Sequence, residues 1–406
     1  MVVKPIGSHV LVFGALVLGT GCADSSQPST LTVRDSSGIT IWESPEPAWQ
    51  GVARWSIGTQ AEFSLGSFES DGPDSFGAIA DVTMLDSGRV VVADALASEV
   101  RVFAIDGRHL VTIGGPGKGP GEFQRLGSVE AVGPDTLVVF DQGARRLSRF
   151  HVSGEFVGSV DLSRLEVNGY PAPPAEVARL SDGSLIVREG WDFSGGLGLT
   201  RDTAHFLAMV EDGSLMRVID WVPGVRTIGE ESNGSNVFRY QPFTPIPRWF
   251  VHHDTVYIAP GETFEIRKVT ADGVVGIVRR SGVPRLIEKS DQARLVDAAT
   301  RGVPPEGRDD ARRFFESMAF PERLPAYAYV LVDPDGYMWA ERFSSTGFRP
   351  GPEWDVFDAS GQYLGAVENP VGLKIFEVGR DHVLGIWADE FDVQYVRSYR
   401  LNKADR

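Results

Sequence analysis

The sequence lacks most of the motifs that mark common catalytic and nucleic-acid-binding proteins. Its 406 residues include a single cysteine, Cys22, so no disulfide can form within the chain. No Gly-x-Ser-x-Gly nucleophile motif and no His-Glu-x-x-His zinc motif is present. The net charge of −16 argues against a nucleic-acid partner, whose phosphates need a basic surface. These absences leave binding proteins and enzymes whose sites have no linear motif.

The N-terminal segment predicts export. Residues 1–21 combine Lys4 with an apolar run, Val10–Leu18, that is too short to span a bilayer comfortably. The segment Leu18-Gly19-Thr20-Gly21-Cys22 resembles the signal of bacterial lipoproteins, although leucine normally stands three positions before the cysteine and here stands four before it. The resemblance implies a signal peptide over 1–21, a lipidated Cys22 at the cell envelope and a flexible tether over 22–30. An ordinary signal peptide that ends near a cysteine is the alternative.

Two copies of one unit dominate the stretch Asp81–Asp161. Each copy contains four short runs that are rich in β-branched residues and separated by turn residues. Such a unit predicts a four-stranded meander, and its repetition favours the blades of a β-propeller. A glycine- and proline-rich link, Gly114–Phe123, separates the copies and suits neither a helix nor a strand.

The turns along the chain predict six blades. Six turns follow an innermost strand, and they lie at 86–88, 133–135, 181–183, 252–254, 333–336 and 379–381. Only five outer turns are found, because the chain ends without a fourth strand in the last unit. Three N-terminal runs, Leu31–Val33, Ile39–Trp42 and Val52–Ile57, are otherwise unassigned. We therefore expect residues 31–402 to form an all-β, six-bladed propeller whose ring is closed by one or more of these runs.

The link and its neighbours resemble a known repeat. Gly121-Glu122-Phe123 is similar to the glycine-rich signature of NHL repeats, and Asp141 and Arg146 match two further positions of that unit. In the first unit Asp94 matches but Glu99 occupies the arginine position, so that pairing is expected to be lost. We expect Asp94, Asp141 and Arg146 to be structural. The resemblance implies an NHL/TolB-like six-bladed propeller lipoprotein of bacteria, a group that shares an architecture and no common reaction.

The long connections all fall on one face of the predicted ring, which we call the insertion face. They are Gly114–Phe123, Glu189–Asp202, Val222–Pro247, Gly282–Ala326 and Phe343–Pro352. The opposite face carries only short turns and is called the tight-turn face. Long loops on a rigid scaffold usually carry binding, so the insertion face is the expected working face. Apolar residues at helical spacing predict two short helices within 282–326, which either cap the channel as a lid or fasten the insertion to the blades.

Arginine and aromatic residues gather on the predicted insertion face. The candidate ligand- or partner-binding residues are Trp191, Arg239, Tyr240, Arg248, Trp249, Arg342, Phe343 and Lys374. These residue types dominate binding hot spots, and arginine grips carboxylates in a bidentate manner. We expect a monomeric, non-catalytic protein that binds a protein, peptide or glycan partner at the cell envelope. The alternative for these arginines is pairing with local acids such as Glu230, Glu231 and Glu353.

The sequence contains no clear metal-binding motif. His252 and His253 are adjacent in a predicted strand and point to opposite faces, so they do not readily share one metal. Six-bladed propellers with lactonase-type activity hold calcium at the channel mouth, and Asp81, Glu130 and Glu176 lie on or beside inner strands. A calcium-dependent hydrolase is therefore the second functional hypothesis. The first hypothesis needs no cofactor.

Overall fold

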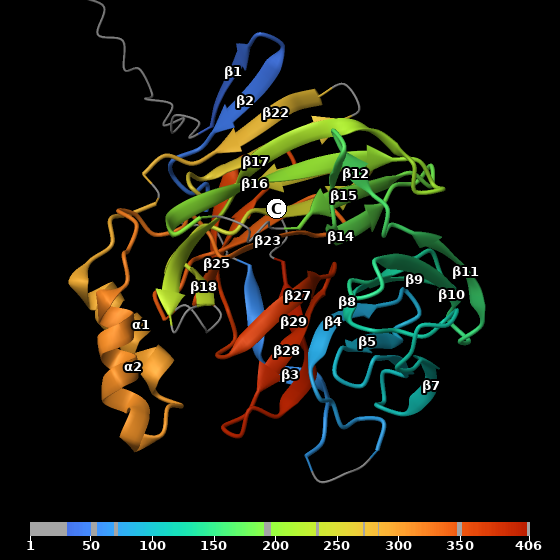
Figure 1. Ribbon diagram of the computed structural model, residues 1–406. Coiled ribbons are helices and arrows are strands. Elements are labelled where there is room, and N and C mark those ends of the chain that lie inside the picture. The colour runs from blue at the N-terminus through green and yellow to red at the C-terminus, as the bar shows by residue number, and fades with distance from the viewer. Residues whose placement is uncertain are drawn as a thin grey trace, which may run out of the picture.

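Six sheets form a ring in the computed structural model (Figure 1), which describes residues 31–49, 55–68, 72–190, 196–232, 235–270, 273–282, 284–346 and 351–403. Each sheet contains a four-stranded antiparallel meander, and the first strand of each meander faces the central channel. The predicted six-bladed propeller is confirmed. Among the described residues, no helix has the length and apolar character needed to cross a membrane.

The blades follow one another along the chain. Blade 1 is β4 (Ile79–Met84), β5 (Val90–Asp94), β6 (Glu99–Phe103) and β7 (His109–Gly114), and blade 2 is β8 (Leu126–Val132), β9 (Thr136–Asp141), β10 (Arg146–His151) and β11 (Phe156–Asp161). A small hairpin, β12 (Glu166–Val167) and β13 (Tyr170–Pro171), precedes blade 3. Blade 3 is β14 (Pro174–Arg179), β15 (Leu185–Glu189), β16 (Gly198–Met209) and β17 (Leu215–Ser232), extended by β18 (Ser235–Tyr240).

The second half of the ring has the same plan. Blade 4 is β19 (Arg248–His252), β20 (Thr255–Ala259), β21 (Glu265–Thr270) and β22 (Gly273–Arg279), and the helices α1 (Lys289–Thr300) and α2 (Pro305–Ser317) follow it. Blade 5 is β23 (Tyr329–Val332), β24 (Met338–Glu341), β25 (Glu353–Phe357) and β26 (Tyr363–Glu368). Blade 6 is β27 (Leu373–Val378), β28 (His382–Ala388), β29 (Gln394–Asn402) and β3 (Ser56–Leu65).

An N-terminal strand closes the ring, as predicted. Strand β3 pairs antiparallel with β29, with Phe63 opposite Ser398, and supplies the fourth strand of blade 6. The two earlier runs take another place. Strands β1 (Thr32–Ser36) and β2 (Ile39–Glu43) form a hairpin, and β2 pairs parallel with β22 at the outer edge of blade 4. Between them and β3, the amide of Trp49 donates to the carbonyl of Leu364 in blade 5 over 2.9 Å. The N-terminal segment thus runs along three blades.

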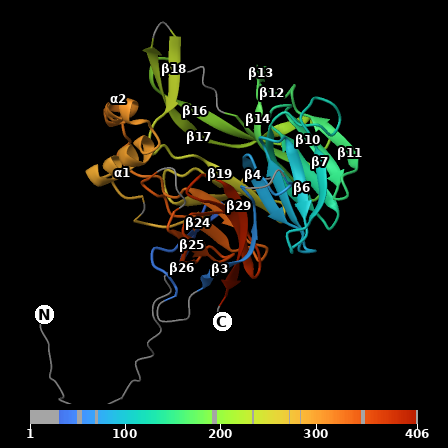
Figure 2. The same ribbon diagram turned by 90° about the horizontal axis from the view of Figure 1, so that it is seen from below.

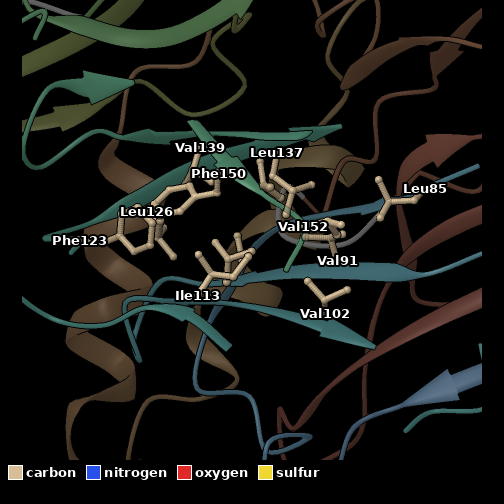
Figure 3. Packing of buried hydrophobic residues seen from close by; sticks show 13 residues of the cluster. Leu85, Val91, Val102, Ile113, Phe123, Leu126, Leu137, Val139, Phe150 and Val152 are labelled. Atoms are coloured by element: carbon tan, nitrogen blue, oxygen red, sulfur yellow. The ribbon is translucent and has the colours of Figure 1, made fainter. Parts of the chain in front are cut away.

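Apolar side chains from facing sheets fill the space between the blades. Figure 3 shows this packing between blades 1 and 2, where Val91, Val102 and Leu137 are fully or almost fully buried. Phe123, from the link between these blades, is also fully buried in the cluster. Gly114 makes room for it, because a Cβ at this position would lie 2.2 Å from the Phe123 ring. The glycine-rich link is therefore a packed part of the core.

Buried polar groups hold the strand ends in a way that differs in detail from the expectation. The Asp141 carboxylate accepts the amides of Gln124, Arg125 and Ala144, and no ion pair with Arg146 forms within the described residues. Arg146 instead donates to the carbonyls of the link, including that of Glu122 at 2.6 Å. In blade 1, Arg101 supplies the arginine that position 99 lacks, since its Nη2 lies 3.6 Å from Asp94. Blade 1 therefore has an aspartate–arginine ion pair after all, with the arginine two residues later than the repeat predicts.

Blade 3 corrects one part of the sequence interpretation. Residues 222–247 were expected to be a loop, yet β17 continues to Ser232 and turns into β18. This extension projects from the ring beside α2 (Figure 2). Proline is tolerated in β17 because Pro223 lies where the strand has no partner on its other edge, and β-bulges in β17 absorb the change of register with β16.

The predicted helices are present between blades 4 and 5. Their base is fastened by an apolar cluster in which Leu295 of α1 packs with Phe243 and Leu324. The fully buried Asp291 carboxylate accepts both terminal nitrogens of Arg285, at 2.6 and 2.7 Å. The hydrogen bonds from Arg285 hold the pKa of Asp291 well below its usual range. The N-terminal end of this insertion is thus fixed by both apolar and ionic contacts.

Candidate functional site

The channel opens on the insertion face into a pocket of about 260 Å³, which we call the channel-mouth pocket. The inner strands of several blades line it. Its main polar and aromatic side chains are Asp81, Glu176, Arg248, Trp249, Tyr329 and Phe376. Each inner strand begins at the insertion face, so the early residues of these strands converge here. Arg248 and Tyr329 are the first residues of β19 and β23.

Arg248 presents unused hydrogen-bond donors to this pocket. Its Nε donates to the carbonyl of Ala328 over 3.1 Å, and its guanidinium carbon lies 4.8 Å from the centre of the Tyr329 ring. Within the part of the chain that the structure describes, its terminal nitrogens have neither an ion pair nor a hydrogen bond. A half-buried guanidinium with free donors is a ready site for an anionic group.

Lys374 supplies a second cation beside the pocket. It is the second residue of β27, and its ammonium nitrogen lies 4.5 Å from the centre of the Phe376 ring. Among the described residues no acid pairs with it. Burial and the positive charge of Arg248 lower the pKa of Lys374, although Glu341 and Asp81 act in the opposite direction. Two like charges are therefore held near each other at the mouth.

The acids of the mouth have their own donors. Burial favours the neutral form of Glu176, but the Arg188 guanidinium, 2.9 Å away, together with the Trp249 indole keeps the pKa of Glu176 below its usual range. Glu341 accepts the amide of Gly351 over 2.6 Å, and burial raises its pKa. Asp81 accepts the amides of Val82 and Val129, each over 2.9 Å, and burial raises the pKa of Asp81 from 3.8 to about 7.

The three expected calcium ligands do not come together. Glu130 accepts the amide of Arg179, the last residue of β14, and so lies toward the tight-turn end of the channel. Asp81 and Glu176 face the insertion end. Across the described residues, no group of three or more His, Cys, Asp or Glu side chains is placed to hold a metal ion. The mouth instead combines acids that accept hydrogen bonds from the protein with two cations whose terminal nitrogens have no protein acceptor among the described residues.

The other predicted binding residues lie away from the channel-mouth pocket or in internal contacts. Arg239 pairs with Glu230 at 3.1 Å and covers the Phe314 ring at 4.7 Å, where β18 meets α2. Tyr240 follows it and is 49% exposed. Burial raises the pKa of Tyr240, and the positive charge of Arg188 acts in the opposite direction.

Two further candidates are held inside the protein. Arg342 pairs with Glu353 and, at 2.7 Å, with Asp355. Phe343 packs edge-on against Phe243, with ring centres 5.7 Å apart, at the base of the helical insertion. Trp191 and Cys22 lie outside the described residues. Of the eight predicted binding residues, the structure thus brings Arg248, Trp249 and Lys374 together at the channel mouth.

Sequence analysis did not select Tyr329, Glu341 or Phe376 for this site. Tyr329 follows a long insertion. Glu341 is the last residue of β24, and sequence analysis selected only the two residues after it, Arg342 and Phe343. The position of Tyr329 at the start of a predicted inner strand was a usable signal, because Arg248 occupies the equivalent position in the preceding blade.

Comparison with known proteins agrees with this architecture. Residues 73–176 match the DUF5128 family, described as a 6-bladed beta-propeller. A member of the DUF4221 family from Bacteroides vulgatus superimposes with a TM-score of 0.51 at 10% identity, over 86% of this chain and 99% of that chain. The chain shares the fold of bacterial six-bladed propellers. No curated protein matches the sequence.

Two further structures of propeller-like proteins are similar at low identity. A Bacteroides fragilis protein named as a candidate exported protein has a TM-score of 0.50 at 14% identity, covering 89% of this chain and 100% of its own. Virginiamycin B lyase from Staphylococcus aureus has a TM-score of 0.42 at 11% identity, covering 85% of this chain and 99% of its own. Likeness at this level concerns the fold and carries no argument about activity.

Proposed function

We propose that this propeller is an exported, lipid-anchored binding protein that takes up a protein, peptide or glycan partner on its insertion face. The observation that carries the proposal is the channel-mouth pocket, where the terminal nitrogens of Arg248 and the ammonium of Lys374 have no acceptor among the described residues while the nearby acids have donors. Buried and half-buried donors are normally satisfied, so a ligand that brings an acceptor stabilises this arrangement. Binding alone, without a reaction, accounts for these groups.

The export part of the proposal is supported by the N-terminal sequence. Residues 1–21 have the character of a signal peptide, and Cys22 stands where a lipid anchor would be attached. The candidate exported protein of Bacteroides fragilis has a similar fold. Nothing specific in the described residues favours the calcium-dependent hydrolase, because no three candidate ligands converge there.

The proposal is tested by photo-crosslinking from the two faces of the ring in the organism that makes the protein. Ile246, in the connection that leads into β19, is 40% exposed on the insertion face. Ile105, in the turn between β6 and β7, is 55% exposed on the tight-turn face. Each isoleucine is replaced in turn by p-benzoylphenylalanine, and the adducts are compared after irradiation.

A discrete adduct from position 246 and none from position 105 is the expected result. Adducts from 105 alone would move the partner to the tight-turn face, and the absence of a specific adduct from 246 would contradict partner binding at the insertion face. Since both positions carry exposed isoleucines in the native protein, the two replacements are matched in size and polarity.

A further inference from the structure

The donors left over at the channel mouth define the chemistry of the missing ligand. A guanidinium has five N–H donors and an ammonium has three. Arg248 uses its Nε–H on the Ala328 carbonyl, and the Lys374 ammonium, which has no hydrogen bond or ion pair among the described residues, lies 4.5 Å from the centre of the Phe376 ring. The nearest carboxylates, Glu176 and Glu341, are engaged with Arg188 and with the Gly351 amide. These carboxylates are each engaged through one oxygen, whereas the terminal nitrogens of Arg248 and Lys374 are cationic donors that an anionic acceptor of the ligand would match.

We propose, building on the binding role above, that the ligand of the channel-mouth pocket is the C-terminal end of a peptide or protein, with its free carboxylate held by Arg248 and Lys374. The last side chain of the ligand then lies against Phe376 and the other apolar atoms of the pocket. Arginine suits this task because its planar fork matches the two oxygens of a carboxylate, and the ammonium adds a compact charge.

The charge balance favours a monoanion over a phosphate. Asp81, Glu176 and Glu341 lie near the two cations, and of these three carboxyl groups Glu176 pairs with Arg188. A dianionic phosphate would meet repulsion from these three carboxyl groups. A carboxylate carries a single charge and needs only two hydrogen-bond donors, which the two cations supply.

The aromatic side chains favour a peptide over a sugar. Sugars commonly bind by stacking on an open aromatic face, but here the Tyr329 ring is covered by Arg248 at 4.8 Å. The Trp249 indole N–H donates to Glu176, and its ring packs edge-on against Phe206 with centres 5.7 Å apart. What remains in the pocket is apolar lining such as Val177 and Val330. This surface suits an aliphatic side chain.

The size and position of the pocket favour a chain end. About 260 Å³ accommodates one terminal residue and excludes a folded domain. The pocket lies at the mouth of a channel walled by inner strands, so a segment that entered it from the middle of a chain would have to turn back on itself. A terminal carboxylate can enter directly. The flanking β18 and α2 are then placed to contact residues further from the end (Figure 2).

The test compares two pools of fluorescently labelled octapeptides of randomised sequence on the immobilised full-length protein. One pool ends in a free carboxylate and the other in an amide, and the pools are otherwise identical. Retention is measured for the wild type, for Arg248→Gln, for Lys374→Gln and for the double variant. Arg380→Gln is the matched control, because Arg380 lies in a turn of the tight-turn face and is 72% exposed, 3.3 Å from Asp335. Far-ultraviolet circular dichroism and melting temperature verify the fold of each variant.

We expect the wild type and Arg380→Gln to retain the carboxylate pool at least tenfold better than the amide pool. The double variant should reduce this ratio to near one. Equal retention of both pools by the wild type would overturn carboxylate recognition while leaving the partner-binding proposal intact. Retention of neither peptide pool would overturn the peptide assignment, and an added arm with polygalacturonate would then show whether an acidic glycan binds instead. The wild-type comparison does not depend on the folding of any variant, and the crosslinking experiment tests the underlying binding role separately.

Discussion

Asp81 shows how the channel wall changes the behaviour of an ordinary carboxyl group. The side chain is partly exposed to the channel yet surrounded by protein, and burial raises its pKa from 3.8 to about 7. Because the folded pKa lies above the unfolded value, the folded state holds a proton that the unfolded chain releases at lower pH. Its stabilising effect is therefore complete below about pH 4 and is lost as the pH rises toward 7.

Replacing this residue should remove that pH dependence. In Asp81→Asn, we expect the free energy of unfolding to change between pH 4 and pH 7 by on the order of 2 kcal/mol less than in the wild type. Urea unfolding at several pH values measures the difference. Asp106→Asn, in an exposed turn, serves as the control and should keep the wild-type slope. Parallel curves for wild type and Asp81→Asn would contradict the assignment.

Gly114 is a second residue whose role is set by its surroundings. Its φ of 81° favours glycine, and a Cβ there would lie 2.2 Å from the fully buried Phe123 ring. Gly107 has a similar φ of 84°, but nothing lies within 4 Å of a Cβ at that position. The two glycines therefore separate backbone strain from steric overlap.

We expect Gly107→Ala to lower the free energy of unfolding by about 1 kcal/mol, from the left-handed backbone alone. Gly114→Ala should cost about 3 kcal/mol, because the added methyl group also forces a well-packed ring to move. Chemical denaturation of both variants gives the comparison. Equal losses would mean that the link around Phe123 yields easily and is not part of the core.

At the scale of strands and helices, the elements that depend on local sequence patterns, namely the blades and the two helices of the insertion, were predictable. Turn residues after each inner strand predicted the number of blades, and apolar residues at helical spacing predicted the two helices of the insertion. The extension of blade 3 was not predictable in the same way. Asp220 to Gly224 contains residues that usually end a strand, and pairing with β16 along one edge keeps this segment in the sheet. Tertiary pairing overrides local preference there.

The candidate site was predictable only in part, for a related reason. Arg248, Trp249 and Lys374 were selected because arginine, lysine and tryptophan stand out beside inner strands. Whether an arginine is free depends on its neighbours, and Arg342 looks equivalent to Arg248 in the sequence. In the structure Arg342 is engaged with Asp355, which lies on the neighbouring strand β25, 13 residues further along the chain. No rule of sequence spacing predicts that Asp355 is the partner of Arg342.

The closing strand β3 allows a direct test at the element scale. Phe63 is 7% exposed and packs in the cluster that joins blades 6 and 1, whereas Val33 of β1 is 55% exposed at the outer edge of blade 4. We expect Phe63→Ala to lower the free energy of unfolding by about 3–5 kcal/mol and Val33→Ala by less than about 0.5 kcal/mol. Urea titration monitored by tryptophan fluorescence measures both. A small effect of Phe63→Ala would show that the ring does not depend on this strand.

For the whole molecule, the response to calcium separates the two functional hypotheses. An ion that binds only the folded state raises the apparent stability of the protein by mass action. Since the described residues bring no three candidate ligands to one point, we expect the melting temperature in millimolar calcium to equal that in excess chelator. Magnesium at the same concentration controls for ionic strength. A rise specific to calcium would favour the hydrolase and direct attention to lactone and ester substrates.

The path of the N-terminal segment also determines the order in which the blades of the ring can be completed during folding. Residues of β3 leave the ribosome early, but their partner β29 is made near the end, as the pairing of Phe63 with Ser398 shows. The β1–β2 hairpin likewise waits for β22. The nascent chain can therefore form blades 1 to 3 while its first strands still lack their final partners. Ring closure therefore waits until β29 has been synthesised, and the first strands stay without their final partners while the blades between them are made.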